Sequence, residues 1–401
     1  MDRPLPLAGF RILSAEQYGA GPYGTMHLAQ LGAEVIKIEP PRVNGGGGDT
    51  ARAVGPHFLR DDESLYFSAF NLNKRSLTLD LRAAEGQAIF RQLAATAHAV
   101  ANNKRGDLPA TLGLTYAALQ DINPAIVCAH LSAYGRDNAR ARWPGYDYLM
   151  QAEAGYLALT GEPGGEPQRM GLSIVDFMTG TLMSVGLLSA LIDAQRTGRG
   201  CDVDTDLLSA AVHQLSYPAV WYMNEGDETQ RTPRSAHPTA TPSQLVKAQD
   251  GWLFIMCQLP KFWNVLTKRI ERPDLARDPR FASNADRLAH RQELTELLDA
   301  HFGRKPVAHW LDLLAGHVPV APVNRLGQAL ENEWLEATGM HTSVDHPDRS
   351  GLQVLASPIR VDGERLPNRA APLLGADTDA LLAELGYAPQ EIARLRQEGV
   401  V

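Results

Sequence analysis

One carboxylate in this 401-residue sequence stands where a helix is expected to begin. Apolar residues recur at three- and four-residue spacings over 174–195 and end at a Thr-Gly pair, which predicts a helix with a glycine stop. Ser173 is its expected N-cap, so Asp176 falls in the first turn. Ser-x-x-Asp before an apolar run is typical of a capping box, in which the acid serves only the helix. The alternative is chemical: a carboxylate kept ionised among free helix N–H groups can attack an acyl carbon, and those N–H groups can hold the resulting oxyanion.

A tyrosine and a second acid come before that helix. Tyr146 and Asp147 open an apolar segment that leads to a Gly/Pro turn over 161–167. Tyr146 can orient a carboxylate or donate a hydrogen bond to an oxyanion, or it can be an ordinary half-buried aromatic residue. Asp147 can hold a neighbouring cation. The stretch 145–180 is therefore the first candidate for the site of chemistry.

A glycine-rich turn near the start of the chain is the second candidate. Gly19, Gly21 and Gly24 fit G-x-G-x-x-G between a predicted strand and a predicted helix, and Glu39 ends the following strand about twenty residues later. This pattern is typical of dinucleotide binding, so a flavin or nicotinamide oxidoreductase is an alternative function. No later segment supplies an obvious redox motif. The glycines can instead serve only to let the helix pack closely.

Strand and helix patterns alternate over 10–131 and indicate the scaffold that must position these residues. Strands are predicted at 11–15, 34–39, 77–81, 97–101 and 125–131, and helices at 22–31, 84–95 and 109–120. This alternation predicts an α/β fold with a large doubly wound parallel, Rossmann-like sheet.

The composition changes after a further apolar helix pattern over 205–223. Residues 224–242 are rich in polar residues, Thr and Pro and are predicted to form a linker, after which strand and helix patterns indicate a smaller α/β domain. We expect a large domain over 1–223, the linker and small domain over 224–330, and a return to the large domain over 331–401.

Composition and charge exclude several classes of protein. A hydrophobic content of 44% over 401 residues is enough for two buried cores, and a net charge of -8 disfavours nucleic acid as a partner. Cys128, Cys201 and Cys257 lie far apart without paired His spacing, so neither disulfides nor a metal site are expected. Residues 1–9 contain no apolar signal core, and the apolar run 177–192 is too short and interrupted for a bilayer. We expect a cytoplasmic protein without a membrane partner.

Several stretches, taken in order, resemble the class III CoA-transferase family, which includes formyl-CoA transferase, the carnitine CoA-transferases and α-methylacyl-CoA racemase. They are LAGFRILSAEQYGAGPYGTMHLAQLGAEVIKIEPP, LYFSAFNLNKRSLTLDL, GYDYLMQAEAGYLALTGEP, GLSIVDFMTG and APLLGADTDALLAELGY. The resemblance implies that Asp176 is the catalytic nucleophile and that two chains form an interlocked homodimer. It also implies that coenzyme A enters as a thioester substrate and that no cofactor is permanently bound.

A site for coenzyme A needs cations and backbone N–H groups for its phosphates. The resemblance places the turn at Ala20 beside the nucleotide part of the coenzyme. The candidate phosphate contacts are Arg42, Arg52, Lys74, Arg75, Asn103, Lys104 and Arg105. Any of these cations can equally be a solvated surface charge. Lys104 stands where relatives usually have an aromatic residue, which puts adenine stacking there in doubt. The run Gly45–Gly48 can be a phosphate cradle or a mobile loop, and it is not a P-loop because no Lys-Ser/Thr follows.

Transferase and racemase activities can be separated within the resembled family. Its racemases pair a histidine with an aspartate as two bases, and the histidine position corresponds to Tyr146 here. A tyrosine with an ordinary pKa near ~10 is a poor base at neutral pH, so a transferase is the better interpretation and a racemase or epimerase the alternative. In the expected mechanism Asp176 attacks a donor acyl-CoA, giving an anhydride and then an aspartyl-CoA thioester that passes CoA to an acceptor acid. Gln17, at the end of the first strand, is a candidate amide contact near the thioester.

The acceptor acid is the least constrained part of this prediction. His237, in a loop that faces the substrate in relatives, is a candidate contact, and the distal carboxylate of a small dicarboxylic acid could pair with Arg142, Arg169 or Arg234. The loop Cys257–Pro260 lacks the glycines that gate the site in formyl-CoA transferases, so glycine-loop gating is not expected. A CoA-binding regulator without catalysis is a further alternative.

Overall fold

The computed structural model describes residues 3–42, 47–61 and 63–401. The chain divides into two compact units. The large unit comprises 1–154, 170–216 and 334–401, and the small unit comprises 155–169 and 217–333. Relative to the expected domains, the small unit also includes 155–169 and 217–223, and the chain returns to the large unit at Trp334.

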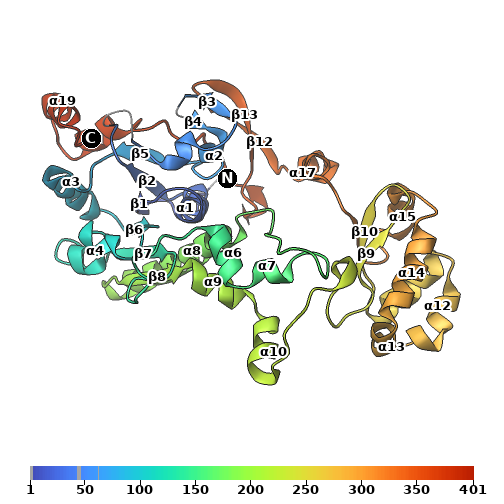
Figure 1. Cartoon of the computed structure of the whole chain (residues 1–401). Coiled ribbons are helices and arrows are strands. Elements are labelled where there is room, and N and C mark those ends of the chain that lie inside the picture. The colour runs from blue at the N-terminus through green and yellow to red at the C-terminus, as the bar shows by residue number, and fades with distance from the viewer. Residues whose placement is uncertain (1–2, 43–46, 62) are drawn as a thin grey trace. The chain divides into compact units, whose positions relative to one another are not determined.

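A six-stranded parallel sheet forms the centre of the large unit (Figure 1). Its order is β5 (Arg75–Thr78), β2 (Glu34–Glu39), β1 (Arg11–Ala15), β6 (Ala99–Asn102), β7 (Val127–Ser132) and β8 (Asp202–Asp206). All neighbouring pairs are parallel. In chain order this is 3-2-1-4-5-6, the doubly wound order in which ligands bind where the winding direction reverses. The predicted Rossmann-like fold is confirmed, and β8 is the strand that the sequence analysis did not predict.

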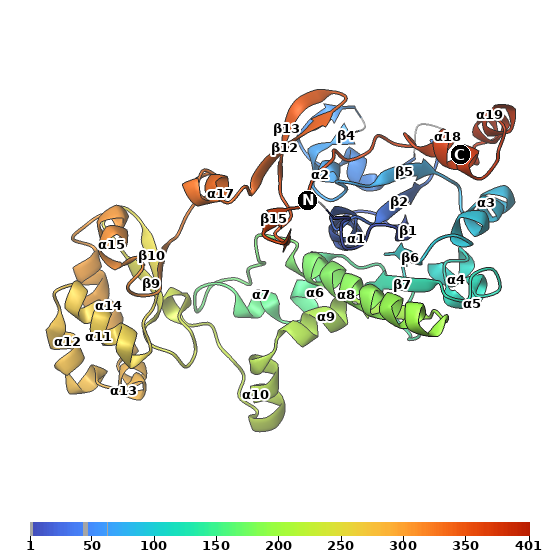
Figure 2. The same ribbon diagram turned by 180° about the vertical axis from the view of Figure 1, so that it is seen from behind.

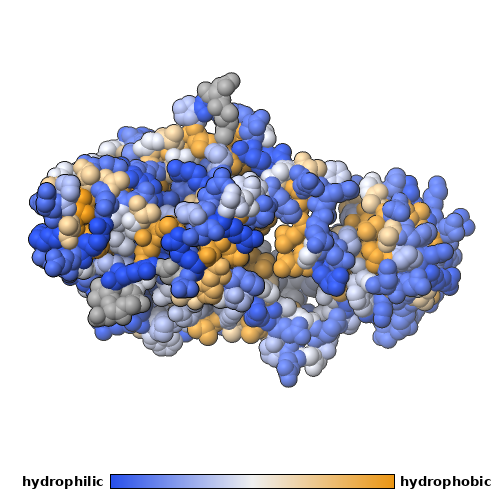
Figure 3. Space-filling view, turned by 90° about the horizontal axis from the view of Figure 1, so that it is seen from above, coloured by the Kyte–Doolittle hydropathy of each residue, from blue (hydrophilic) through white to orange (hydrophobic). Residues whose placement is uncertain are grey.

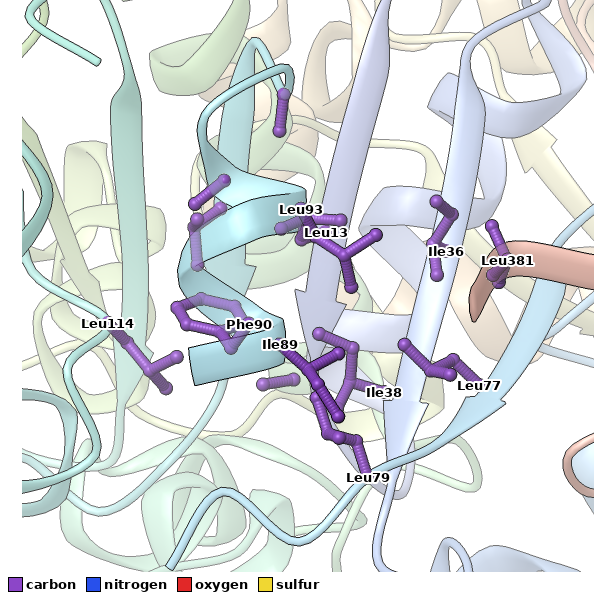
Figure 4. Close-up of a cluster of buried hydrophobic side chains, with 14 of the residues drawn as sticks. Leu13, Ile36, Ile38, Leu77, Leu79, Ile89, Phe90, Leu93, Leu114 and Leu381 are labelled. Atoms are coloured by element: carbon purple, nitrogen blue, oxygen red, sulfur yellow. The ribbon is translucent and has the colours of Figure 1, made fainter. Parts of the chain in front are cut away.

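One face of the sheet is covered by α3 (Ala84–Ala94), α4 (Leu108–Thr111), α5 (Tyr116–Leu119), α18 (Thr378–Glu384) and α19 (Pro389–Gln397). Alternate strand side chains such as Leu13 and Ile36 point to this face because successive residues of a strand face opposite sides. Figure 4 shows them gathered with Ile89, Phe90 and Leu93 of α3. These side chains are almost completely buried and form the larger apolar core.

The opposite face is covered by α1 (Ala20–Gln30) and α8 (Ile174–Thr197). The two helices lie side by side in Figures 1 and 2. Their backbones touch: a Cβ built on Gly24 would lie 2.3 Å from the Gly180 carbonyl oxygen, and one on Gly180 would lie 2.2 Å from the Ala20 oxygen. Of the helices described by the structure, α8 alone is long and apolar enough to cross a membrane by length and composition. In this structure it packs against α1, β7 and β8.

Two predicted helices are interrupted. The pattern over 109–120 divides into α4 and α5 around Gly113, whose φ is +68°. The pattern over 205–223 begins as the end of β8 and continues as α9 (Leu207–Gln214) and α10 (Tyr217–Glu225), separated by Ser216 at φ +52°. A left-handed residue cannot continue a right-handed helix, and hydrophobic spacing alone does not reveal such a break.

The remaining elements of the large unit are short. They are η1 (Thr50–Ala53), β3 (Phe58–Arg60), β4 (Glu63–Ser64), α2 (Leu65–Ser68), α6 (Asp147–Glu153), β12 (His341–His346), β13 (Arg349–Leu355), β14 (Arg360–Val361) and β15 (Glu364–Arg365). The C-terminal part also joins the sheet edge, where Asp377 Oδ2 accepts a hydrogen bond from Ser76 N at 2.9 Å and Val400 O accepts one from Asp80 N at 2.8 Å. On the face seen in Figure 3 hydrophilic residues predominate, with hydrophobic patches between them.

The small unit has its own antiparallel sheet and core. Its strands, in the order β11 (Val320–Pro322), β10 (Trp252–Met256) and β9 (Ser243–Lys247), pack with α11 (Pro260–Arg269), α12 (Pro273–Arg277), η3 (Pro279–Phe281), α13 (Asn284–Ala289), α14 (Arg291–Phe302) and α15 (Val307–Leu314). Shorter elements are α7 (Tyr156–Leu159), η2 (Pro233–Ser235), α16 (Leu326–Leu330) and α17 (Glu333–Ala337), which ends in the large unit. Buried Trp263, Leu298 and Phe302 mark the core.

Candidate active site

The candidate site lies at the carboxyl ends of β1 and β6, where the winding of the sheet reverses. Gln17 follows β1 and Asn103 follows β6. Two hydrogen bonds join the Gln17 backbone to the Asn103 side-chain amide. Gln17 N donates to Asn103 Oδ1 at 2.8 Å, and Asn103 Nδ2 donates to the Gln17 carbonyl oxygen at 2.6 Å. This amide pair joins the two strand ends and fixes the backbone next to the glycine-rich turn.

Asp176 is brought to the same place by the contact between α1 and α8. A Cβ built on Gly19, the residue before α1, would lie 2.8 Å from Asp176 Oδ2. The glycine therefore leaves the space that the carboxylate occupies. The second glycine of the pattern also has little free space, because a Cβ on Gly21 would lie 3.0 Å from Glu16 Oε2 and 3.1 Å from Asn103. Close packing thus accounts for all three glycines of the pattern. The Asp176 carboxylate lies beside Gly19, where its negative charge would repel the pyrophosphate of a dinucleotide.

Asp176 is not the cap of its helix. Ser173 occupies the N-cap position, but its side chain makes no capping hydrogen bond. Asp147 caps the helix from α6 instead: its Oδ2 accepts a hydrogen bond from Asp176 N at 3.0 Å, and its Oδ1 accepts one from Gln151 Nε2 at 2.6 Å. The capping-box interpretation of Asp176 is therefore wrong, and Asp147 caps the first turn of α8. The Asp176 carboxylate itself takes no part in the capping of α8.

The pKa of Asp176 is raised to about 7, first by burial and then by the negative charge of Asp147. Both effects disfavour the ionised form. This upward shift of the pKa runs against the expectation that the helix N-terminus keeps the carboxylate ionised. A carboxylate with a higher pKa is also a stronger base, and hence a better nucleophile once it is ionised.

Tyrosine side chains gather around this carboxylate. The ring of Tyr18 makes edge contacts with those of Tyr66 and Tyr146, each with centroids 5.9 Å apart. Tyr146 is 61% exposed, so the alternative that it is an ordinary half-buried aromatic residue is not supported. Burial and then the charge of Asp176 raise the pKa of Tyr66 to about 12, which keeps its hydroxyl protonated as a hydrogen-bond donor near the acid. Tyr66 was not predicted as a site residue, and its position in the motif LYFSAFN was the signal that could have identified it.

The backbone of the turn that carries Tyr18 is fixed by two buried charged side chains, Asp49 and Lys37. Tyr18 has a φ of +65°, an uncommon conformation for an aromatic residue, and its N–H donates to Asp49 Oδ1 at 3.0 Å. Asp49 Oδ2 lies 2.8 Å from Lys37 Nζ, which also donates to the Glu16 carbonyl oxygen at 3.0 Å. The Asp49 and Lys37 side chains are fully buried. This anchor fixes the backbone between β1 and α1 in a single conformation.

A cavity of about 170 Å³ lies between these elements. Its lining includes five of the predicted site residues besides Asp176 and Tyr146, namely Gln17, Ala20, Asn103, Lys104 and Arg105. Trp143, Leu131 and Leu207 supply apolar wall. The structure therefore brings Asp176 together with most of its predicted partners. The Arg105 guanidinium is bound to Asp107, with Nε–Oδ1 and Nη2–Oδ2 distances of 2.6 and 2.8 Å.

Three predicted phosphate contacts lie elsewhere and have structural partners. Arg52 is buried between Glu39 and Glu63 and stacks 3.7 Å from the centre of the Phe67 ring. Lys74 is fully buried, with Nζ 2.9 Å from Glu16 Oε1. Arg75 begins β5 and pairs with Glu34 at the amino end of β2, the opposite edge of the sheet from the cavity. The side-chain N–H groups of Arg52, Lys74 and Arg75 are used in these ion pairs. The expectation that these three residues bind phosphate is therefore corrected.

Two further predictions are not placed at this cavity. Arg42 is exposed and is the last described residue before position 43. In the predicted glycine run, Gly45 and Gly46 lie outside the described residues. His237 belongs to the small unit, where its Nε2 lies 3.5 Å from the Tyr217 hydroxyl oxygen. Cys257 is buried there, as expected for an apolar filler. Among the described residues, no group of three His, Cys, Asp or Glu side chains could hold a metal ion.

Comparisons with known proteins give this geometry a chemical context. The family model described as CoA-transferase family III matches residues 7–378. The succinyl-CoA:glutarate CoA-transferase of Mus musculus is 32% identical over all of this chain and 91% of its own length. The acetyl-CoA:oxalate CoA-transferase of Acetobacter aceti is 33% identical, covering 96% of this chain and 97% of its own.

A solved structure agrees with these sequence matches. The crystal structure of a CaiB/BaiF family protein from Brucella suis superposes with a TM-score of 0.82 at 32% identity, covering 96% of this chain and 100% of that one. The family match and the relatives extend over nearly the whole chain, including the cavity around Asp176. This chain is a member of CoA-transferase family III.

Proposed function

We propose that this enzyme moves CoA from an acyl-CoA thioester to a small carboxylic acid, with Asp176 as the nucleophile. The observation that carries the proposal is the state of Asp176. Its carboxylate lines a cavity at the reversal point of the sheet, while Asp147 takes over the capping that would otherwise occupy it. A transferase of this kind needs one positioned carboxylate. The reaction requires neither ATP nor a metal ion, because one thioester is exchanged for another.

The proposed reaction has four steps at Asp176. The carboxylate attacks the donor carbonyl carbon, the C–S bond breaks, and CoA thiolate leaves behind a mixed anhydride. The thiolate then attacks the aspartyl carbonyl and releases the donor acid, giving an aspartyl-CoA thioester. The acceptor carboxylate attacks that thioester, the C–S bond breaks, and a second anhydride forms with release of CoA thiolate. The thiolate returns to the acceptor acyl carbon, and Asp176 is regenerated as a carboxylate.

Groups around the cavity have matching roles in this proposal. The first N–H groups of α1, at Ala20 and Gly21, have no partner within their helix and can stabilise the oxyanion that forms beside Asp176. The Tyr66 hydroxyl is a second donor, and exposed Tyr146 can orient an entering carboxylate. Gln17, fixed by Asn103, lines the path of the thioester. The anchored turn keeps these groups in place before substrate enters.

The substrates are proposed from the relatives. Their names specify glutarate, oxalate and mesaconate as acids, and succinyl-CoA, acetyl-CoA and formyl-CoA as thioesters. A small dicarboxylic acid is therefore the acceptor class that we assign to this chain. The proposal includes a cytoplasmic homodimer, whose mass of twice 43.7 kDa can be checked by sedimentation equilibrium.

The alternative functions are less well supported by the site. No histidine is among the described residues that line the cavity, so the two-base arrangement of a racemase has no second base there. A dinucleotide would place its pyrophosphate against Asp176. A regulator without catalysis would have no use for a carboxylate whose pKa is raised.

The test uses purified enzyme with succinyl-CoA or acetyl-CoA and a panel of small mono- and dicarboxylic acids. New acyl-CoA species are followed by mass spectrometry, and borohydride reduction of the aspartyl-CoA intermediate marks the residue that carried it. We expect new thioesters from the wild type and a loss of at least about 10³-fold in Asp176→Asn.

Asp193→Asn is the matched control, because Asp193 is an exposed residue of the same helix. It should exchange CoA like the wild type. Exchange that persists in Asp176→Asn, or a borohydride mark on another residue, would contradict the proposed mechanism. CoA binding without exchange in the wild type would favour the regulator.

A further inference from the structure

Asp49 is a buried acid that directly follows the glycine run. It is 3% exposed, and it is not among the described residues that line the cavity around Asp176. Its two carboxylate oxygens have different partners. Oδ1 accepts hydrogen bonds from Tyr18 N at 3.0 Å and Ala51 N at 2.9 Å. Oδ2 lies 2.8 Å from Lys37 Nζ, so Asp49 connects the turn after β1 with a side chain of β2.

The backbone at Tyr18 needs such a partner. Its φ of +65° is a left-handed conformation, which crowds the side chain of most residues and persists only where the surroundings hold it. Lys37 holds the preceding residue, because its Nζ donates to the Glu16 carbonyl oxygen at 3.0 Å. Gln17 is bonded to Asn103 as described above. Three consecutive residues of the turn are therefore each tied to a side chain from another part of the chain.

The described glycines before Asp49 allow the chain to place it there. Gly47 and Gly48 have φ values of +149° and +74°, which glycine adopts without strain. Gly48 N donates to the Pro40 carbonyl oxygen at 2.8 Å, so the segment folds back on the end of β2. Asp49 N then donates to Glu39 Oε2 at 2.9 Å. These two glycines thus have a structural use in burying Asp49, without a phosphate.

The turn that Asp49 holds is the one that meets the proposed nucleophile. A Cβ on Gly19, the residue after Tyr18, would lie 2.8 Å from Asp176 Oδ2. The first N–H groups of α1, the proposed oxyanion donors, come directly after Gly19. A change of φ at Tyr18 would redirect the chain and move these groups relative to Asp176. A misplacement of about 1 Å at reacting atoms can cost about 10²-fold in rate.

We propose that Asp49 is a positioning residue of the transfer reaction. By accepting the hydrogen bond from Tyr18 N, it keeps the turn before α1 in the conformation that faces Asp176. Lys37 supports it by pairing with its buried charge. This inference rests on the proposed function and deepens it, since it adds a residue that acts without touching the substrate. The ion pair holds Asp49, whereas the hydrogen bond to Tyr18 does the positioning, so the two contributions can be separated.

Two double variants separate them. Lys37→Met/Asp49→Asn removes both charges of the buried pair and keeps an amide oxygen that can accept from Tyr18 N. Lys37→Met/Asp49→Leu removes the same charges and has a side chain of similar size without an acceptor. Neither leaves a buried charge unpaired, so the two proteins differ mainly in the hydrogen bonds of one oxygen.

The measurements are kcat and KM for CoA exchange, with urea unfolding to compare stability. We expect kcat of the Asn variant to stay within about threefold of the wild type, and kcat of the Leu variant to fall by about 10- to 100-fold. In the Leu variant kcat/KM for the CoA thioester should fall by the same factor as kcat, because the lost interaction serves only the transition state. Amide hydrogen exchange at Tyr18, followed by mass spectrometry, should be slow in the wild type and the Asn variant and faster in the Leu variant.

Three outcomes would overturn the inference. One is the same kcat in both double variants, whether high or low, because the hydrogen bond to Tyr18 would then be irrelevant. Another is a Leu variant in which only KM rises, which would indicate a role in binding. The third needs the Asn variant alone, and so serves where the Leu variant does not fold: a folded Asn variant that has lost about tenfold or more of kcat. Failure of the proposed function would be visible separately, as absence of CoA exchange in the wild type.

Discussion

At the scale of single residues, the site depends on two carboxylates with different tasks. Asp147 satisfies the N-terminus of α8 through Asp176 N, and its negative charge contributes to the raised pKa of Asp176. In the proposed mechanism Asp176 must be ionised to attack, so we expect the rate to rise with pH through a pKa of about 7. The first acid thus holds the backbone of the second in place and adds to the effect of burial on its pKa.

Asp147→Asn tests this coupling. The amide oxygen of asparagine can still accept the hydrogen bond from Asp176 N, while the repulsive charge is removed. We expect the pKa of Asp176 to fall, because a neutral neighbour no longer disfavours its ionised form, so the acid limb of the profile of kcat/KM against pH moves to lower pH. An acid limb that stays in place would show that burial alone sets the pKa. Glu153→Gln, an exposed change at the other end of α6, should leave the profile unchanged.

The sequence predicted Asp176 but not the residues that control it. Asp176 was recognisable because a carboxylate in the first turn of an apolar helix is a distinct local pattern. Asp147 lies 29 residues away, and its contact with Asp176 N arises only when α6 packs against α8. The buried partners of Arg52 and Lys74 were hidden for the same reason, because charge in a sequence does not show which acid it will meet in the fold.

At the scale of elements, the position of Asp176 depends on how closely α1 and α8 approach. Gly24 and Gly180 allow the two backbones to touch, and this contact brings the first turn of α8 against the turn before α1. Any side chain at these glycines must push the helices apart. Asp176 would move with α8, so helix packing and the proposed catalysis are linked through one glycine pair.

Gly180→Ala is expected to lower both stability and activity. The new methyl group would lie 2.2 Å from the Ala20 carbonyl oxygen, and overpacking of this kind costs about 1–3 kcal/mol or more of the free energy of unfolding. Urea unfolding and kcat measure the two effects. Gly171→Ala is the matched control, because a Cβ there meets nothing within 4 Å. If the enzyme tolerates Gly180→Ala as well as Gly171→Ala, the helix contact is not what fixes Asp176.

Regular elements were predictable where the sequence pattern is local. The strands at 11–15 and 34–39 and the helix from 84 were expected within about a residue of their observed bounds. The strand β8 was missed because its sequence, DVDTD, alternates acids with few apolar residues at the edge of the sheet. The break at Ser216 was missed because serine in a left-handed conformation has no marked sequence signal.

At the scale of the whole molecule, each of the two units has a hydrophobic core of its own. The small unit encloses Trp263, Leu298 and Phe302, whereas the core of the large unit lies between its sheet and α3. Units with separate cores can unfold in separate transitions. The free energy of unfolding of this enzyme is therefore better described by two values than by one.

Calorimetry of paired core variants tests this division. Leu298→Ala removes fully buried methyl groups from the small unit and should destabilise that unit by about 2–5 kcal/mol, lowering one of two transitions. Leu381→Ala, equally buried in the large unit, should lower the other. A single transition that both variants shift together would show that the units unfold as one.

The part played by residues 334–401 in the large sheet also has a consequence for biosynthesis. Leu381, Leu395 and Val400 complete the core against α3, and Asp80 N bonds to Val400 O. A ribosome adds these 68 residues in about 3 to 14 seconds at ~5–20 residues per second. Throughout that interval the N-terminal strands are already synthesised, and the face that α3, α4 and α5 share with α18 and α19 lacks its C-terminal cover. The large unit thus reaches its native state after the small unit has been translated, and until then its nascent sheet is a natural substrate for chaperones.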